Sequence, residues 1–498
     1  MSKRKDNKES SSSNQYGKKS VLINIGWKMF ERSSSLIITF LIQILLARIL
    51  APSDFGLAAM ITVFVTLSTI FVSGGLSSAL IQKKDADELD FSTIFWLNIG
   101  VSGILYLILF VTAPMISQFL GYPQLTLMLR VLSLKLLISA VNSIQTAYIS
   151  KNMMFRFYFY STLSGKIASG IVGITIAVLG GGAWALIGQA LSLQFLETVV
   201  LWSKAKWRPR KKFSLERARN LYSFAWKIML MTFIEAIRDQ LRNLLIGKKY
   251  SSEALAYYDK GFLFPTNIVT NISSSLTAVM FPVLSNAQDN KDKALALCRR
   301  WLSVFTYSVL PVLVGLIMTA NQLVSVILTE KWLPSVPYLQ LACIAYIAWI
   351  IEVPIRETLK SLGHAGAILN MQVIKTIVAL IVLFMVMNYG VMAIAISGVG
   401  LGLFNVTVSI YVGSKLFQYN LKRLLYDTLP TIALNILMGC SVYVVSQLTV
   451  SDKYLLIIQI FTGVIVYVFA SIVTRNKNYL YVKELFQTVI SRRRKSME

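Results

Sequence analysis

The chain has 498 residues, of which 55% are hydrophobic and only 14% are charged. Soluble domains carry roughly 25% charged residues, so these charges are too few to cover a water-soluble surface. The net charge of +26 would indicate nucleic acid in a soluble protein, but the basic residues cluster at the ends of apolar segments, and we expect no nucleic-acid partner. One histidine and three scattered cysteines have no metal-ligand spacing, so we expect no metal site.

Apolar segments of near-constant length recur along the whole chain, and each can cross a hydrocarbon core of roughly 30 Å. The predicted spans are 26–49, 56–81, 92–113, 125–148, 157–179, 183–203, 221–246, 262–284, 301–328, 336–356, 365–388, 391–414, 427–448 and 454–474. The predicted fold class is therefore an all-α polytopic membrane protein of about fourteen transmembrane helices. The polar stretches between the spans are too short for a soluble catalytic domain, and we expect no enzyme.

The order of the segments predicts two lobes of six helices each. Trp27-Lys28 opens the first helix and Trp226-Lys227 opens the seventh, which indicates an internal repeat of the kind that transporters use to form a site between two halves. The predicted parts are a disordered cytoplasmic tail at 1–20, a first lobe at 21–203, a basic cytoplasmic loop at 204–220, a second lobe at 221–414, two further helices at 415–474 and a basic cytoplasmic tail at 475–498.

Lysine and arginine are concentrated in every second loop between the predicted spans. The two tails and the loops after even-numbered spans carry most of them, including the dense run from Lys204 to Arg219. The opposite loops carry far fewer: Lys248, Lys249, Lys260, Lys331 and Lys453. The positive-inside rule therefore places both termini in the cytoplasm.

Two of the predicted helices carry most of the charge at membrane depth, where ionisable residues are costly and tend to face a cavity or one another. In the seventh helix four charges follow the spacing i, i+3, i+4 and i+7, which forms a single stripe that must face protein or water. The candidate substrate-binding residues are the basic ones of the first and seventh helices: Lys28, Arg32, Lys227, Arg238 and Arg242. The candidate residues for binding a coupling ion are the acidic ones: Glu31, Glu235 and Asp239.

These charges also have a structural interpretation. Pairing within the helix, Glu235 with Arg238 and Asp239 with Arg242, would make the stripe a neutral packing element. We expect the lysines in other spans to be structural or interfacial: Lys135, Lys166 and Lys375. If the stripe lines a cavity instead, its arginine side chains match phosphate oxygens bidentately and indicate an anionic substrate. A GxxxxGK[ST] motif is absent from the sequence, so we expect no ATP hydrolysis.

Several short motifs resemble those of a known family. The run LARILAPSDFG at 46–56 resembles the first-loop signature of Wzx-type polysaccharide flippases, a branch of the multidrug/oligosaccharidyl-lipid/polysaccharide exporter superfamily. Further matches follow in order: IQKK at 81–84, FWLN at 95–98, FPVLS at 281–285 and EKW at 330–332. The set covers nearly the whole chain and is most similar to the colanic-acid and teichuronic-acid exporter branch.

The resemblance implies two six-helix lobes around a cationic central cavity, which the first, second, seventh and eighth helices line. It implies a flippase that moves an undecaprenyl-diphosphate-linked oligosaccharide from the cytoplasmic to the outer leaflet of the bacterial cytoplasmic membrane, by alternating access, for surface polysaccharide biosynthesis. The expected partners are this lipid-linked oligosaccharide, the lipid bilayer and the polysaccharide polymerase machinery. We expect no cofactor other than H⁺ or Na⁺ as a coupling ion.

Three alternatives stay open on the sequence. A channel or scaffold is one of them, but it would not need the internal repeat. A multidrug cation antiporter of the same superfamily should have an acidic cavity, whereas the charges here are mixed to basic. A membrane-embedded polysaccharide polymerase or acyltransferase would need a sizeable loop or a catalytic His or Asp in a re-entrant segment, and the sequence shows neither.

Overall fold

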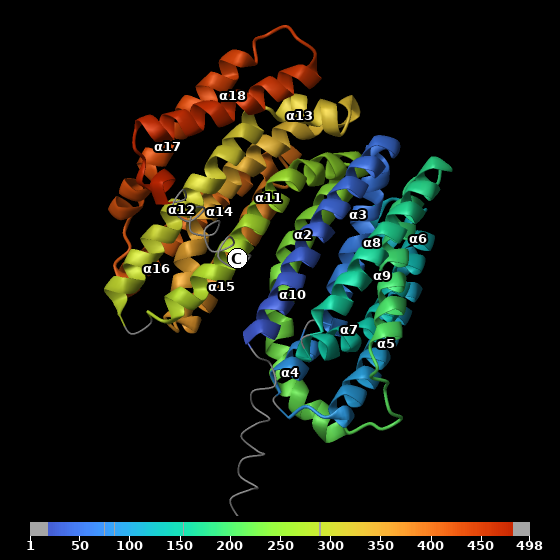
Figure 1. Ribbon diagram of the computed structural model, residues 1–498. Helices are drawn as coiled ribbons and strands as arrows, with labels where there is room; N and C mark the ends of the chain where they lie inside the picture. Colours follow the sequence, from blue (N-terminus) through green and yellow to red (C-terminus); the bar gives the residue numbers. More distant parts are fainter. Residues whose placement is uncertain (1–17, 74, 84, 153, 288–289, 482–498) are drawn as a thin grey trace, which may run out of the picture. The chain divides into compact units, whose positions relative to one another are not determined.

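The computed structural model describes residues 18–73, 75–83, 85–152, 154–287 and 290–481, and every regular element in these ranges is a helix (Figure 1). The helices up to the middle of the chain are α2 (Lys18–Ile49), α3 (Pro52–Ser73), α4 (Leu76–Gln82), α5 (Glu88–Leu120), α6 (Leu125–Leu132), α7 (Leu134–Lys151), α8 (Phe155–Val178), α9 (Trp184–Lys204) and α10 (Leu215–Lys249). The remaining helices are α11 (Ser252–Ser285), α12 (Lys291–Met318), α13 (Ala320–Ile327), the 3₁₀ helix η2 (Glu330–Ser335), α14 (Val336–Ser361), α15 (Ala365–Val386), α16 (Val391–Phe417), α17 (Leu421–Val445) and α18 (Asp452–Val473).

The described part of the chain contains 13 helical stretches that are long and apolar enough to cross a membrane. They account for every predicted span except the seventh, 221–246, which lies in α10 and is too rich in charged residues to be apolar. The predicted fold class, an all-α polytopic membrane protein, is confirmed. Three predicted spans are each formed by two consecutive helices: 56–81 by α3 and α4, 125–148 by α6 and α7, and 301–328 by α12 and α13.

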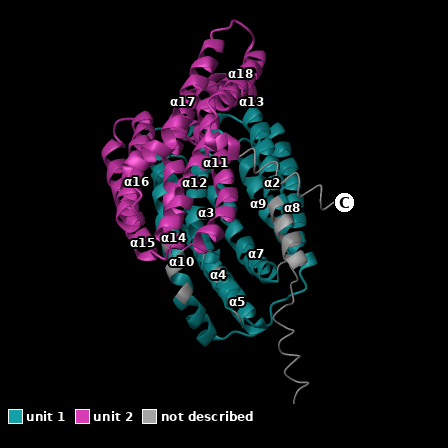
Figure 2. Ribbon diagram, turned by 60° about the vertical axis from the view of Figure 1, so that its left-hand side comes forward, with its two compact units in different colours: residues 1–253 teal, residues 254–498 magenta. Residues whose placement is uncertain are grey.

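Two compact units divide the chain, residues 1–253 (unit 1) and 254–498 (unit 2), as Figure 2 shows in two colours. In unit 1, α8 packs on α2 and α9, α7 packs on α5 and α9, and α10 packs on α3, α4 and α5. In unit 2, α14 packs on α12 and α16, and α17 packs on α12 and α18. The predicted lobes with a boundary at 204–220 stay a prediction.

The helices α3 and α4, which form the second predicted span, both pack on α10. Helix α10 passes so close to the junction of α3 and α4 that a Cβ on Gly75 would overlap the backbone carbonyl of Ala225. A second close approach involves the LARILAPSDFG motif, in which a Cβ on Gly56 would overlap the backbone of Ser252. In the same motif Asp54 Oδ2 accepts a hydrogen bond from the backbone N–H of Ala51 at 3.1 Å, which stabilises the start of α3. The motif residues therefore have local structural roles.

Candidate functional site: charged residues of the membrane helices

The charged residues of α2 differ in their surroundings. Glu31 is buried, with 8% of its surface exposed, whereas its neighbour Arg32 is exposed. Successive residues of a helix point about 100° apart, because 3.6 residues make one turn. Arg32 is thus exposed, whereas Glu31 is surrounded by protein. Lys28 lies in α2, but its side chain is outside the described residues.

The neighbours of Glu31 form a cluster of both charge signs in unit 1. Lys166 of α8 reaches α2, where its Nζ donates hydrogen bonds to Thr39 Oγ1 at 2.7 Å and to the carbonyl oxygen of Ser35 at 3.2 Å. Glu197 of α9 interacts electrostatically with Lys166, with Glu31 and, more weakly, with Lys135 of α7. Buried charges are stable in such a place only when they are paired and hydrogen-bonded. The cluster links α2 to α8 and α9.

Sequence reasoning did not single out Glu197. The signal was present, because Glu197 is an acidic residue inside an apolar span, 183–203, and such residues tend to be functional or paired. Its partners lie on three other helices, and this proximity is a property of the tertiary structure.

The charged stripe of α10 is partly paired. Arg238 Nε donates to Asp239 Oδ1 at 3.2 Å, and the two side chains are 30% and 50% exposed. The pair thus joins adjacent residues. The predicted pairs, Glu235 with Arg238 and Asp239 with Arg242, stay predictions. Glu235 is exposed and Arg242 half-buried, and the side chain of Lys227 is outside the described residues.

The candidate cations of α2 and α10 belong to different packing groups of unit 1. Helix α2 packs on α8, whereas α10 packs on α3, α4 and α5. That Arg32 and Arg238 face one another across a cavity stays a prediction. Arg32 is exposed, and the side chain of Arg238 is 30% exposed beside Asp239.

Unit 2 contains an ion pair that is almost completely buried. Lys375 Nζ of α15 donates to Glu352 Oε1 of α14 at 2.8 Å and to Ser409 Oγ of α16 at 2.9 Å. The side chains of Lys375 and Glu352 are 4% and 7% exposed. This pair joins three helices and fits the structural role that we expected for Lys375.

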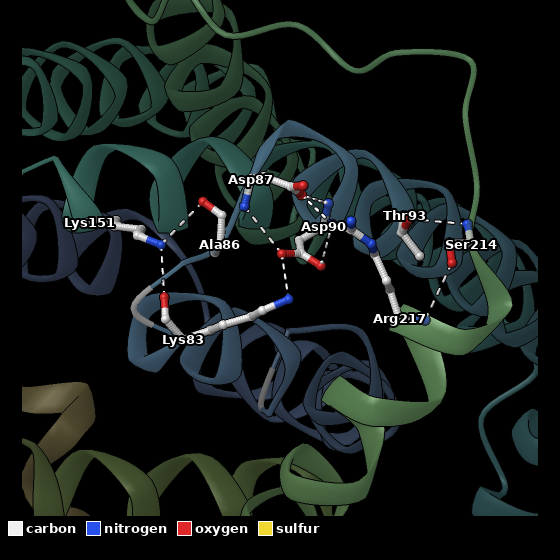
Figure 3. A network of polar contacts seen from close by, with 8 residues as sticks. All are labelled: Lys83, Ala86, Asp87, Asp90, Thr93, Lys151, Ser214 and Arg217. Atoms are coloured by element: carbon white, nitrogen blue, oxygen red, sulfur yellow. Dashed lines mark hydrogen bonds and ion pairs between the residues drawn. The ribbon is translucent and has the colours of Figure 1, made fainter.

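A second polar network lies at the ends of the spans in unit 1, and Figure 3 shows it from close by. The buried carboxylate of Asp90 accepts from Lys83 Nζ at 2.6 Å and lies 3.3 Å from the guanidinium of Arg217, which also pairs with Asp87. Asp87 and Asp90 form a capping box at the start of α5. Lys151 Nζ donates to the carbonyl oxygen of Lys83 at 2.9 Å. The loops after the second, fourth and sixth spans, which the positive-inside rule assigns to one side, thus meet.

The guanidinium of Arg217 changes the acidity of its partner. Its hydrogen bond and charge, with the backbone N–H groups of the capping box, lower the pKa of Asp87 from 3.8 to about 2. The same hydrogen bond raises the pKa of Arg217. The pair is therefore ionised at any physiological pH.

Known proteins resemble the chain over most of its length. A membrane protein in the cps region of Klebsiella pneumoniae is 26% identical over 491 residues, which cover 93% of this chain and 97% of that protein. The lipopolysaccharide biosynthesis protein WzxC of Escherichia coli is 27% identical over 414 residues, 79% of this chain and 82% of that protein. The lipid II flippase MurJ in an inward closed conformation has the same fold, with a TM-score of 0.73 at 16% identity over 91% of this chain and 99% of MurJ.

These similarities confirm the predicted resemblance to Wzx-type exporters. The family described as "Polysaccharide biosynthesis protein" matches residues 45–337, which is more than half of the chain and includes all five motifs in full. The chain therefore belongs to the polysaccharide biosynthesis protein family.

Proposed function

We propose that the protein is a flippase that translocates an undecaprenyl-diphosphate-linked oligosaccharide from the cytoplasmic to the outer leaflet. The proposal rests on the fold, because 91% of the chain matches the structure of a lipid II flippase. The chain also belongs to a family of polysaccharide biosynthesis proteins. Lipid II is itself a polyprenyl-diphosphate-linked saccharide, so the same fold would serve a substrate of the same chemistry. Transport without a covalent step is the proposed role, and no enzyme activity is part of it.

The proposed mechanism is alternating access, with the polyprenyl chain in the bilayer and the head group in the protein. Arg32 and Arg238 would bind the diphosphate, because each side chain is at least partly exposed and ends in a planar fork that fits two phosphate oxygens. A diphosphate carries about two negative charges. Moving them outward across a membrane with a negative interior is favourable by roughly 4.6 kcal/mol per 100 mV, at about 2.3 kcal/mol per charge.

A coupling ion, H⁺ or Na⁺, is a further part of the proposal. Glu31 is the strongest of the three candidates because it is buried and shares an electrostatic cluster with Lys166 and Glu197. Asp239 is paired with Arg238, so ion binding there would compete with that arginine. Glu235 is exposed.

The proposed location is the bacterial cytoplasmic membrane, with both termini in the cytoplasm and the polysaccharide polymerase machinery as a partner. The network at Asp90 supports this topology, since it joins three loops that the positive-inside rule assigns to the cytoplasm. Reporter fusions after Lys206 and Lys422 should report the cytoplasm, and fusions after Gly121, Gly181 and Tyr389 the outside. Two adjacent loops on the same side would disprove the arrangement.

A deletion strain provides the test of function. Lipid analysis of that strain should show accumulation of one polyprenyl-diphosphate-linked oligosaccharide in the inner leaflet, and the wild-type gene should remove it. If the strain instead becomes sensitive to cationic drugs with unchanged lipids, a multidrug antiporter is the better assignment. If the strain accumulates single repeat units that have been exported but not polymerised, a polysaccharide polymerase is the better assignment.

A further inference from the structure

A pocket of about 810 Å³ lies where the start of α5, the end of α7 and the segment after α9 meet. Its basic lining residues are Lys151, Lys206, Arg208 and Arg210. Its acidic lining residues are Asp87 and Glu88. All three segments are ends of predicted spans, so the pocket lies where the head groups of a bilayer leaflet would be.

The acidic residues of the pocket are already neutralised by arginines. Asp87 pairs with Arg217, which is not a lining residue, and Glu88 pairs with Arg210. The guanidinium of Arg208 donates to backbone carbonyl oxygens, those of Ala205 at 2.6 Å and Trp207 at 2.8 Å. Such bonds satisfy donors without cancelling the positive charge, so the pocket keeps an excess of positive charge.

The segment that supplies three of the four basic residues is held in place. Gln145 Nε2 of α7 donates to the carbonyl oxygen of Trp207 at 3.1 Å, and the backbone N–H of Arg210 donates to Ser92 Oγ at 2.9 Å. Trp96 Nε1 donates to the carbonyl oxygen of Arg210 at 2.9 Å. The indole of Trp207 is buried in the core. A pocket fixed in this way loses little conformational entropy when a ligand binds.

We propose that this pocket binds the phosphate head group of an anionic phospholipid from the leaflet beside it. A lipid fits better than free phosphate because exposed apolar side chains follow the basic segment in the chain: Phe213 and Leu215 are 51% and 75% exposed. Basic clusters at the end of a membrane helix attract anionic lipids, and apolar side chains beside them insert at the interface. The inference does not depend on the proposed transport function.

Native mass spectrometry of the full chain in a neutral detergent tests the proposal. Dioleoylphosphatidylglycerol is titrated against dioleoylphosphatidylcholine, and the Kd of the first bound lipid is measured for each. The pocket variant is Lys206→Gln with Arg210→Gln, both exposed side chains. The matched control is Lys211→Gln with Lys212→Gln, which removes the same charge from exposed positions of the same segment outside the pocket lining.

We expect wild-type protein to prefer phosphatidylglycerol, the pocket variant to lose about tenfold or more of that affinity, and the control to stay within about twofold. Thermal melting of each variant checks that the fold is intact. Equal losses in both variants would mean a diffuse basic surface and would overturn the proposal, as would unchanged binding in both. Displacement of phosphatidylglycerol by inorganic phosphate at equal concentration would show that the pocket prefers free phosphate, which also overturns it.

Discussion

Lys375 and Glu352 form a hydrogen-bonded ion pair at 2.8 Å in which both side chains are almost fully removed from solvent. Ser409 accepts a second hydrogen bond from the ammonium group, so α14, α15 and α16 of unit 2 are joined at one point. A buried pair of this kind is costly to break from one side, because the remaining charge has no partner. The contribution of this ion pair to the stability of the protein can therefore be measured by replacing one partner.

Replacing Lys375 by Met should destabilise the protein by about 3–5 kcal/mol, because Glu352 is then buried without its partner. The double variant Lys375→Met with Glu352→Gln should recover part of that loss. Thermal unfolding in detergent measures both. Lys360→Met is the control, since the Lys360 side chain is 60% exposed in its pair with Glu357 and should change stability by about 1 kcal/mol or less. A double variant as unstable as the single one would contradict this account.

Arg32→Ala and Arg238→Ala should each strongly reduce export while the protein stays in the membrane at a normal level. Arg32→Glu should be worse than Arg32→Ala, because it places a negative charge against the diphosphate. Arg32→Lys should retain partial function if a point charge is enough, and none if the planar fork is required. Complementation of the deletion strain, with protein quantified by immunoblot, measures all four.

The pair Arg238–Asp239 has its own test. If it is only a neutral packing element, Arg238→Ala combined with Asp239→Ala should restore export, because both charges are then removed together. We expect no such rescue, because the arginine is proposed to contact the substrate. Export at the wild-type level in the double variant would assign the pair to structure and exclude Arg238 from the site.

The stability that Asp87 contributes should depend on pH in the acidic range. The pKa of Asp87 is lowered from 3.8 to about 2 in the folded protein, so its contribution is present above about pH 3.8 and is lost as the pH falls toward 2. Asp87→Asn should therefore make the melting temperature less sensitive to pH in this window. Asp85→Asn, at an exposed position in the same loop, is the control. Identical pH profiles for wild type and Asp87→Asn would refute the prediction.

Gly75→Ala should lower the amount of folded protein, because the added Cβ meets the rigid backbone carbonyl of Ala225 rather than a flexible side chain. Overpacking of this kind costs roughly 1–3 kcal/mol. Gly100→Ala and Gly103→Ala in α5 are matched controls, since nothing lies within 4 Å of a Cβ at either position. Fluorescence-detected size-exclusion chromatography after heating gives the comparison. A melting temperature unchanged by Gly75→Ala would show that α10 can move away from the junction.

Much of the candidate site was visible in the sequence, because charge at membrane depth stands out against an apolar background. Glu31, Arg32 and the stripe of α10 were identified in this way. The partners of these charges were not. The spacing of the stripe allows ion pairs between residues i and i+3, yet Arg238 pairs with the adjacent Asp239. The rotamer of the long arginine side chain decides which of several neighbouring carboxylates it contacts. Glu197 joins the cluster at Lys166 only because α8 and α9 pack on one another.

The sequence by itself determined the membrane spans, because the cost of exposing polar backbone and charge to hydrocarbon acts on each segment separately. All 14 predicted spans correspond to helices of the structure, and α10 differs from the others only in its charge. The tertiary structure alone decided which helix ends and buried charges meet: Asp90 with Arg217, 127 positions later in the chain, and Lys375 with Glu352. The physical reason is that hydrophobicity is a property of a segment, whereas an ion pair depends on distances that only the packing of helices sets.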